Sequence, residues 1–129
     1  MKKVLFICVE NACRSQIAEA FFNKYAMGKA VAISAGTRPA SHVNPRAVEV
    51  MKEVGIDISK QKPKLLTQEM TREVDKIVTM GCGAEFCPAP YVKAEDWSIE
   101  DPSGKSLDKF REVRDQIKRK VEKLVKEIS

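Results

Sequence analysis

The sequence predicts one α/β domain of three layers (α/β/α), with helices on both faces of a mostly parallel four-stranded sheet. Short apolar runs alternate along the chain with segments of helical periodicity, an order that favours right-handed βαβ units. The chain has 129 residues, which is room for one hydrophobic core, so residues 1–129 are assigned to a single domain. Its residues are 43% hydrophobic and 32% charged, a balance typical of globular proteins.

The first three elements are predicted to be a strand, a helix and a second strand. Residues 3–8 (KVLFIC) form a short β-rich apolar run, as expected of a buried strand. In residues 14–26 the apolar side chains recur every three or four positions, which predicts a helix, and Gly28 is placed to end it as the C′ residue. Residues 30–35 (AVAISA) are again a compact apolar run and are predicted to be the second strand.

Two helices in the middle of the chain are predicted from their first residues. Asn44 is a favourable N-cap and Pro45 a favourable first helical residue, so a helix is expected from here to Gly55. Thr67 is likewise placed to cap a short helix that extends to Val74. Residues 56–66, between these two helices, show no regular pattern.

The last part of the chain begins with a third strand, residues 76–80, followed by a loop rich in glycine and proline, residues 81–90. Residues 93–98 are predicted to form a short fourth strand. Residues 106–128 give the clearest helix, because apolar residues recur along one side of it. These residues are Leu107, Phe110, Val113, Ile117, Val121, Leu124 and Ile128.

The net charge of +5 lies mostly in the last helix, since residues 105–129 contain nine Lys or Arg and five Asp or Glu. Because acids are interleaved with the bases, we interpret this stripe as a solvated helix face and expect no nucleic-acid partner. The longest apolar run, residues 4–9, is shorter than the ~18 residues of a transmembrane helix or the about 7–15 of a secretory signal. We therefore expect a cytoplasmic protein with no membrane partner.

Cys8 ends the first predicted strand, and a loop of five residues joins it to Arg14 at the start of a helix. Such a loop can wrap into a ring whose backbone N–H groups face inward, and the helix dipole adds partial positive charge. The ring suits a tetrahedral oxyanion, and Arg14 can hold two of its oxygens in a bidentate contact. The predicted oxyanion-binding residues are Glu10, Asn11, Ala12, Cys13, Arg14 and Ser15.

The same positive field favours a reactive sulfur at Cys8. Helix N-termini and neighbouring cations stabilise a thiolate over a thiol, and a hydrogen bond from Ser15 would stabilise it further. The expected product is a nucleophilic sulfur beneath a bound anion. The alternative is a buried structural Cys8 with Arg14 in a surface ion pair.

Four cysteines in a chain expected in the cytoplasm favour metal binding or thiol chemistry over structural disulfides. Cys8 and Cys13 form one pair, and Cys82 and Cys87, after the third strand, form another of the same spacing. Ligands bind beyond the carboxyl ends of parallel strands, so we expect Cys8 and Cys82 at one edge of the sheet. A four-thiolate zinc site in an interaction module remains an alternative.

Several ordered segments of the chain together carry a family resemblance: FICVENACRSQIAEAFF, ISAGT, VNPRAVEVMKEVGIDIS, IVTM-GC…CP, EDWSIEDPSGKS and the final helix. They resemble the low-molecular-weight tyrosine phosphatase fold, and specifically its branch of thioredoxin-coupled arsenate reductases. The resemblance implies an enzyme that reduces arsenate to arsenite with thioredoxin or a related thiol reductant, as a monomer and with no cofactor. The alternative in the same fold is a tyrosine phosphatase acting through a Cys8 phosphocysteine.

The resemblance also implies a disulfide relay. Cys8 attacks arsenate, and Cys82 then attacks Cys8 and releases arsenite. Cys87 attacks Cys82 in turn and leaves a Cys82–Cys87 disulfide for the reductant. Cys13 has no part in this relay and is expected to be a packed thiol, with protective pairing to Cys8 as a side possibility.

Asp101, which precedes Pro102, is implied as the general acid that protonates the leaving oxygen. Asp96 is its nearest competitor, but no proline follows it. His42 is expected to make a polar contact rather than to act in catalysis, because its loop lies away from the motif.

The chain departs from the family at two positions. Glu10 stands where the family often has glycine, and its side chain is expected to face outward. Some members bind potassium beside the loop through Asn, Glu, Ser and Asp; Asn11, Glu19 and Ser34 match, but Lys64 stands in place of the Asp. We expect the Lys64 ammonium to substitute for the cation, and we predict no metal requirement.

Overall fold

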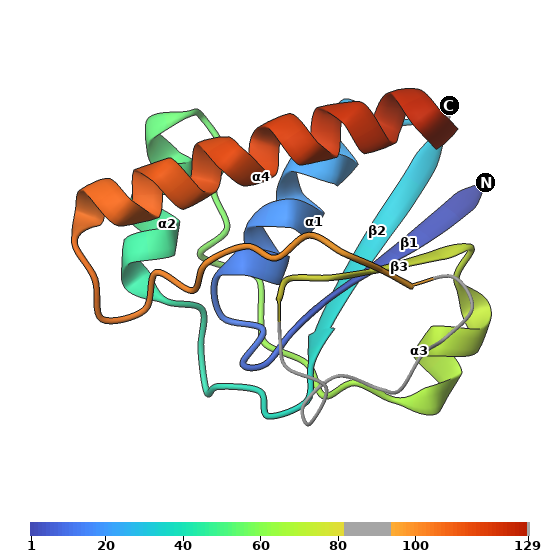
Figure 1. Ribbon diagram of the computed structural model, residues 1–129, viewed down its shortest axis with the longest axis horizontal. Coiled ribbons are helices and arrows are strands. Elements are labelled where there is room, and N and C mark those ends of the chain that lie inside the picture. The colour runs from blue at the N-terminus through green and yellow to red at the C-terminus, as the bar shows by residue number, and fades with distance from the viewer. Residues whose placement is uncertain (82–93, 129) are drawn as a thin grey trace.

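A computed structural model of the chain describes residues 1–81 and 94–128 (Figure 1). The strands form one sheet in the order β2-β1-β3-β4, and every neighbouring pair is parallel. The strands are β1 (Lys2–Cys8), β2 (Ala30–Gly36), β3 (Lys76–Thr79) and β4 (Ala94–Asp96). The helices are α1 (Arg14–Tyr25), α2 (Pro45–Glu53), α3 (Gln68–Glu73) and α4 (Leu107–Ile128). The predicted α/β class and four-stranded parallel sheet are confirmed.

The central strand β1 is buried, and its alternate residues belong to two separate apolar clusters. Phe6 and Cys8 pack with residues of α1, α2 and α4, whereas Leu5 and Ile7 pack on the side of α3. Because successive side chains of a strand point to opposite faces, helices cover both faces of the sheet (Figure 1). Burying a large apolar side chain contributes about 1.5–3 kcal/mol. The sequence period of β1 thus builds the three predicted layers and places Cys8 on the face of α1.

The helix starts in the middle of the chain agree with the prediction. The Asn44 side chain accepts a hydrogen bond from the backbone N of Arg46 at 2.9 Å, and α2 begins at the next residue, Pro45. The Thr67 hydroxyl accepts one from the backbone N of Met70 at 3.2 Å and caps α3. Each cap satisfies an N–H group that has no partner within its own helix.

Two predicted boundaries were wrong by a few residues. Helix α1 ends at Tyr25 with Ala26 as its C-cap, so Gly28, with a φ of 82°, serves the following turn rather than the C′ position. Strand β4 ends at Asp96 instead of extending to Ser98, because Ser98 adopts a left-handed φ of 49° that turns the chain out of the strand direction. Neither change alters the order of the elements.

The outer side of β2 is covered by groups from neighbouring segments. The Asn23 side chain of α1 accepts a hydrogen bond from the backbone N of Ala32 at 2.7 Å and donates one to the carbonyl of the same residue at 3.1 Å. Further along the strand, the N of Gly36 donates to the Lys64 carbonyl, and its carbonyl accepts from the N of Leu66.

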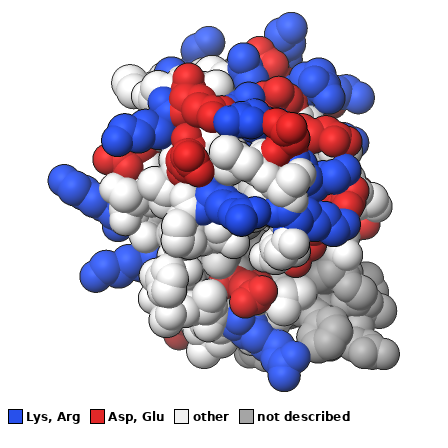
Figure 2. Space-filling model, turned by 90° about the vertical axis from the view of Figure 1, so that its left-hand side faces the viewer, with Lys and Arg blue, Asp and Glu red and all other residues white. Residues whose placement is uncertain are grey.

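Charged side chains are mixed on the side of the molecule where α2 and the start of α4 lie. Figure 2 shows Lys and Arg interspersed with Asp and Glu on this face rather than gathered in one basic area. Arg111 pairs with Glu53 and Asp108, for example. Although α4 is 22 residues long, no helix in the described part of the chain has the length and apolar character needed to cross a membrane.

Candidate active site

Cys8 is the last residue of β1 and lies opposite Gly36 of β2. The chain then forms the loop of residues 9–13, and α1 begins at Arg14. This packing needs a glycine at position 36, because a Cβ there would lie 2.6 Å from the Val9 carbonyl oxygen and 2.9 Å from the backbone N of Asn11. The strand–loop–helix arrangement predicted around Cys8 is therefore present.

The backbone of the loop turns its carbonyl groups outward. The carbonyl oxygens of Val9, Glu10, Asn11, Ala12 and Cys13 accept hydrogen bonds from Arg38 N, Ala40 N, Gln16 Nε2, Asn44 N and Ile17 N, respectively. In a trans peptide the N–H group points opposite to the preceding carbonyl, and the described residues contain no cis peptide. The N–H groups of residues 10–14 are therefore directed to the inside of the loop, as an oxyanion site requires.

The sulfur of Cys8 contacts a hydroxyl in the first turn of α1, with 2.8 Å between Cys8 Sγ and Ser15 Oγ. Asn11 Nδ2 donates a hydrogen bond to the same hydroxyl at 2.6 Å. The orientation of this amide is fixed, because Asn11 Oδ1 accepts the backbone N–H of Lys64 at 2.9 Å. With one lone pair of the Ser15 oxygen engaged by Asn11, its proton is available to the sulfur.

A second buried side chain, Gln16, supports the loop from behind. Its Nε2 donates to the backbone and side-chain oxygens of Asn11 and to the Lys62 carbonyl, each at 3.0 Å. Its Oε1 accepts a hydrogen bond from Gln61 Nε2 at 2.6 Å. Gln16 is not among the site residues predicted from the sequence; its place next to Ser15, in the first turn of a helix, was the available signal.

The residues that match a potassium site in the sequence do not fit a cation well. Asn11 Oδ1 already accepts two hydrogen bonds, from Gln16 Nε2 and from the backbone N of Lys64. The Lys64 ammonium lies 3.8 Å from Glu19 Oε1, and a second cation beside it would be repelled. Ser34 Oγ is buried without a hydrogen-bond partner among the described residues. The contacts of Asn11 and Lys64 favour the expectation that Lys64 takes the place of a cation, whereas the unpartnered Ser34 hydroxyl does not.

Arg14 is 7% exposed, and backbone carbonyls hold its guanidinium. Nη1 donates to the Met80 carbonyl at 2.6 Å and to the Ile99 carbonyl at 2.9 Å. These contacts use both N–H groups of Nη1 and leave those of Nε and Nη2 for an anion. The two carbonyls follow β3 and β4, respectively, and the sequence could not identify them, because a backbone carbonyl carries no residue signature.

Asp101 lies at the mouth of the loop, with 4.0 Å between its Oδ2 and Arg14 Nη2. The backbone N of Ser103 donates to Asp101 Oδ1 at 3.0 Å and orients the carboxyl group. The structure thus brings Asp101 to the loop that holds Cys8, from a part of the chain more than 90 positions away. A small hollow between them is lined by Cys8, Val9, Glu10, Ala12, Cys13, Arg14, Asp101 and Ser103.

Asp96, the competing acid, is engaged elsewhere. Burial alone would raise the pKa of Asp96, but hydrogen bonds from Thr79, Ser98 and the backbone N of Gly81 outweigh it and hold the pKa below its ordinary value. A carboxylate stabilised in this way is a poor proton donor. The geometry therefore favours Asp101 over Asp96 as a proton source near Cys8.

Cys13 and Glu10 are two further predicted residues of the loop. Burial raises the pKa of the Cys13 thiol far above its usual range, and Cys8 and Asp101 raise it further against the opposite effect of Arg14. Cys13 therefore stays protonated, and what it offers an anion is its backbone N–H group. Glu10 is exposed, as expected of a side chain that faces outward.

Cys82 and Cys87 lie outside the described residues, so their roles and the placement of Cys82 beside Cys8 stay predictions. The zinc alternative needs the same two residues. Within residues 1–81 and 94–128, no three His, Cys, Asp or Glu side chains are grouped so that they could hold a metal ion.

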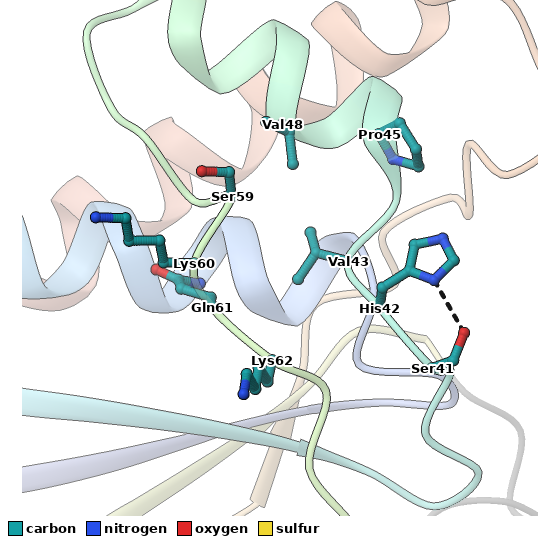
Figure 3. Close-up of a pocket in the computed structure, with 9 residues that line it drawn as sticks. All are labelled: Ser41, His42, Val43, Pro45, Val48, Ser59, Lys60, Gln61 and Lys62. Atoms are coloured by element: carbon teal, nitrogen blue, oxygen red, sulfur yellow. Dashed lines mark hydrogen bonds between the residues drawn. The ribbon is translucent and has the colours of Figure 1, made fainter.

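A larger hollow of about 720 Å³ lies between the start of α2 and residues 59–62 (Figure 3). It contains none of the predicted site residues, and Val43, Pro45 and Val48 give it an apolar lining. The volume of a hollow does not identify the anion site, because an oxyanion is small and is recognised by hydrogen-bond donors that converge on it. His42 forms a hydrogen bond with the Ser41 hydroxyl at 2.9 Å, which is the polar contact predicted for it.

The chain matches the family model described as low molecular weight phosphotyrosine protein phosphatase over residues 3–129. It is 42% identical over 132 residues to the glutaredoxin arsenate reductase of Synechocystis sp., with complete coverage of both chains. It matches the solved structure of an arsenate reductase in the phosphate binding state with a TM-score of 0.90 and 41% identity, again over all of both chains. A thioredoxin-dependent arsenate reductase of Corynebacterium glutamicum matches with a TM-score of 0.84 and 40% identity, covering 99% of this chain and 62% of that one. From this agreement over nearly every residue, the chain belongs to the low molecular weight phosphotyrosine protein phosphatase family.

Proposed function

We propose that the chain is an arsenate reductase that converts arsenate to arsenite through thiol chemistry at Cys8. The observation that carries the proposal is the setting of this sulfur, which lies 2.8 Å from the Ser15 hydroxyl, beside Arg14 and next to inward-facing N–H groups. Relatives named arsenate reductases are 40–42% identical and match almost all of this chain, which supports arsenate as the substrate.

The first step forms a bond between sulfur and arsenic. The Cys8 thiolate attacks the arsenic atom of bound arsenate, and an oxygen leaves. The inward N–H groups of the loop and Arg14 stabilise the charge on the remaining oxygens. Asp101 delivers a proton to the departing oxygen, so that water leaves instead of a strongly basic oxide. The product is a Cys8–arsenic(V) adduct.

The second stage supplies the two electrons that arsenic needs. The Cys82 thiolate attacks the Cys8 sulfur, the sulfur–arsenic bond breaks, and its electron pair reduces arsenic(V) to arsenic(III). Arsenite leaves, and a Cys8–Cys82 disulfide remains. Cys87 then attacks Cys82 and frees Cys8 as a thiolate. The net oxidation of two thiols to one disulfide balances the reduction of one arsenate.

A dithiol reductant must reopen the Cys82–Cys87 disulfide. We infer that thioredoxin or a related protein does so, acting on a monomer in the cytoplasm, where such reductants keep thiols reduced. The relatives support both kinds of reductant, because one is named a glutaredoxin arsenate reductase and another is described as thioredoxin-dependent. The two reductants are therefore separate arms of the test.

The test is an arsenate-reduction assay of the purified chain with thioredoxin, glutaredoxin or a low-molecular-weight thiol as the reductant. We expect multiple turnovers with a dithiol protein. Cys87→Ser is expected to release one arsenite per enzyme molecule and then to stop, since the Cys8–Cys82 disulfide still forms. Cys82→Ser is expected to release none. Sustained turnover by Cys87→Ser with thioredoxin would contradict the relay.

A phosphatase acting through a Cys8 phosphocysteine is the second candidate, and membership of the family favours it. Phosphate and arsenate share shape and charge, so the same loop suits both anions. The second cysteine pair, Cys82 and Cys87, distinguishes the two functions, because a phosphatase needs only the Cys8 sulfur. Efficient hydrolysis of an aryl phosphate that survives Cys82→Ser and Cys87→Ser, without arsenate reduction, would favour the phosphatase.

A further inference from the structure

We propose that Asp96 is a positioning residue for Arg14, because its carboxylate joins the two chain segments whose carbonyl oxygens hold the Arg14 guanidinium. The proposal rests on the proposed function in one respect, namely that Arg14 binds the oxyanion. In the proposed role, Asp96 does not contact the anion. It acts through the backbone.

Among the described residues, the carboxylate of Asp96 accepts hydrogen bonds from three residues. Register places Asp96, at the end of β4, directly opposite Thr79 at the end of β3. Asp96 Oδ1 accepts hydrogen bonds from Thr79 Oγ1 and from the backbone N of Gly81, both at 2.7 Å. Asp96 Oδ2 accepts one from Ser98 Oγ at 2.8 Å. Both oxygens are thus engaged, one with the segment after β3 and one with the segment after β4.

These contacts lie next to the carbonyls that hold Arg14. Gly81 directly follows Met80, and Ser98 directly precedes Ile99. The carbonyls of Met80 and Ile99 are the acceptors of Arg14 Nη1, at 2.6 and 2.9 Å. One carboxylate therefore fixes each segment within a residue of its contact with the guanidinium.

The backbone at this junction adopts conformations that need outside support. Ser98 has a φ of 49°, which is unusual for a residue with a side chain and persists only where the surroundings impose it. Gly81 has a φ of 90°, and a Cβ there would lie 3.2 Å from Ser98 Cα. The two segments are therefore in close contact, and Asp96 bonds to both of the residues at that contact.

Losing the Asp96 carboxylate should let the two carbonyls move relative to each other. Arg14 Nη1 would then lose one of its two acceptors or rotate to follow it. Its Nε and Nη2 groups would leave the orientation that suits two oxygens of a tetrahedral anion. The expected result is weaker oxyanion binding by a folded protein whose Cys8 loop is still held by Asn11 and Ser15.

The experiment measures phosphate binding, which does not depend on arsenate reduction. Bound phosphate is expected to protect Cys8 against alkylation by iodoacetamide, so mass spectrometry of the Cys8 peptide at increasing phosphate concentration measures the phosphate dissociation constant. For Asp96→Ala we expect this constant to rise about tenfold, the effect of misplacing a charge-assisted hydrogen bond. Asp96→Asn keeps an acceptor for Thr79 and Gly81 and should restore most of the affinity.

The matched control is Glu95→Ala, which removes the neighbouring carboxylate of β4. Glu95 bonds to Lys76 and to the Trp97 indole but not to Gly81 or Ser98, the residues next to the carbonyls that hold Arg14. We expect its phosphate constant to be unchanged. A merely structural role for Asp96 would lower the melting temperature of Asp96→Ala without changing phosphate affinity or the KM for arsenate.

An unchanged phosphate constant in folded Asp96→Ala would overturn the proposal. Should that variant fail to fold, Ser98→Ala removes one of the three contacts, and an unchanged constant there would have the same meaning. A wild-type protein that binds phosphate but reduces no arsenate would refute the proposed function alone. The phosphate constants of the variants would still decide the role of Asp96.

Discussion

Two arginines of this protein are almost equally buried, Arg14 at 7% and Arg114 at 8% exposure, but they are held in different ways. In the contact between α2 and α4, Arg114 bonds to the Val50 carbonyl and pairs with Glu53 and Asp115, each at 2.8 Å. At the Cys8 loop, Arg14 bonds to two carbonyls, and its one carboxylate within 4.0 Å among the described residues is Asp101, at that limit.

The difference separates a cation that supports the fold from one that is available to a ligand. Burying a charge is costly unless it is paired and hydrogen-bonded. Carboxylates at 2.8 Å neutralise Arg114, whereas carbonyl dipoles orient Arg14, and the Asp101 carboxylate compensates its charge only from 4.0 Å. An arriving oxyanion can complete the pairing of Arg14, and that is the property a binding site needs.

The largest expected effect comes from Arg14→Lys. The lysine keeps the charge but cannot bond to two carbonyls and present two donors to an anion at once. We expect kcat/KM for arsenate to fall by about 100-fold or more, with little change in the free energy of unfolding. Steady-state kinetics and urea denaturation check the two parts, and near-normal kinetics would remove Arg14 from the site.

Asp101→Asn tests whether the carboxylate near Arg14 acts as an acid rather than as a counter-ion. Losing a general acid should lower kcat by about 100-fold and leave the KM for arsenate nearly unchanged. Glu100→Gln is the control, because this neighbouring carboxylate pairs with Lys105 and Lys109 instead. A rise in KM with an unchanged kcat would show that Asp101 serves binding rather than proton transfer.

Arg114→Met should give the opposite pattern to Arg14→Lys. Losing the bonds to Val50 and Glu53 should lower the free energy of unfolding by about 1–3 kcal/mol, measured by urea denaturation. Arsenate kinetics should be unchanged. Arg111→Met, which removes the more exposed partner of Glu53, should lower the free energy of unfolding less. A kinetic defect in Arg114→Met would contradict the assignment of a purely structural role to Arg114.

The smallest effect is an acid dependence of stability at Glu53. Hydrogen bonds from Arg111 lower its pKa from 4.5 to about 2, against the opposing effect of burial and with further help from Arg114. Because the folded-state pKa is depressed, this stabilisation is present above pH 4.5 and is lost as the pH falls toward 2. Glu53→Gln should therefore lose less stability than wild type between these values, and parallel pH profiles would contradict the pairing.

The strands and helices, and the end of the sheet that carries Cys8, could be predicted from the sequence because both depend on local patterns. A short β-rich apolar run placed Cys8 at the end of β1, and the Asn44–Pro45 pair located the start of α2. Chain order also implied parallel pairing of the first three strands, because a helical segment follows β1 and others follow β2. The errors concerned short features, such as the end of β4, where the backbone of Ser98 overrides strand propensity.

The support of the site was harder to predict because much of it is backbone. Nothing in the sequence marks the Met80 and Ile99 carbonyls as the partners of Arg14. Gln16 can support the loop only because the fold brings residues 61–64 next to it, and its contacts there are with Gln61 and Lys62. Asp96 was considered only as an acid, since Thr79 and Gly81 reach it from the end of the neighbouring strand and are not evident in its own segment.

The amide of Asn23 has a consequence beyond the local geometry of β2. The Asn23 amide forms hydrogen bonds with both the N–H and the carbonyl group of Ala32. It thus takes the place of a further strand at this edge of the sheet. An unsatisfied border of this kind is where foreign polypeptides add on and where aggregates nucleate. One short side chain, projected from a helix, thus occupies two backbone groups that an added strand would need.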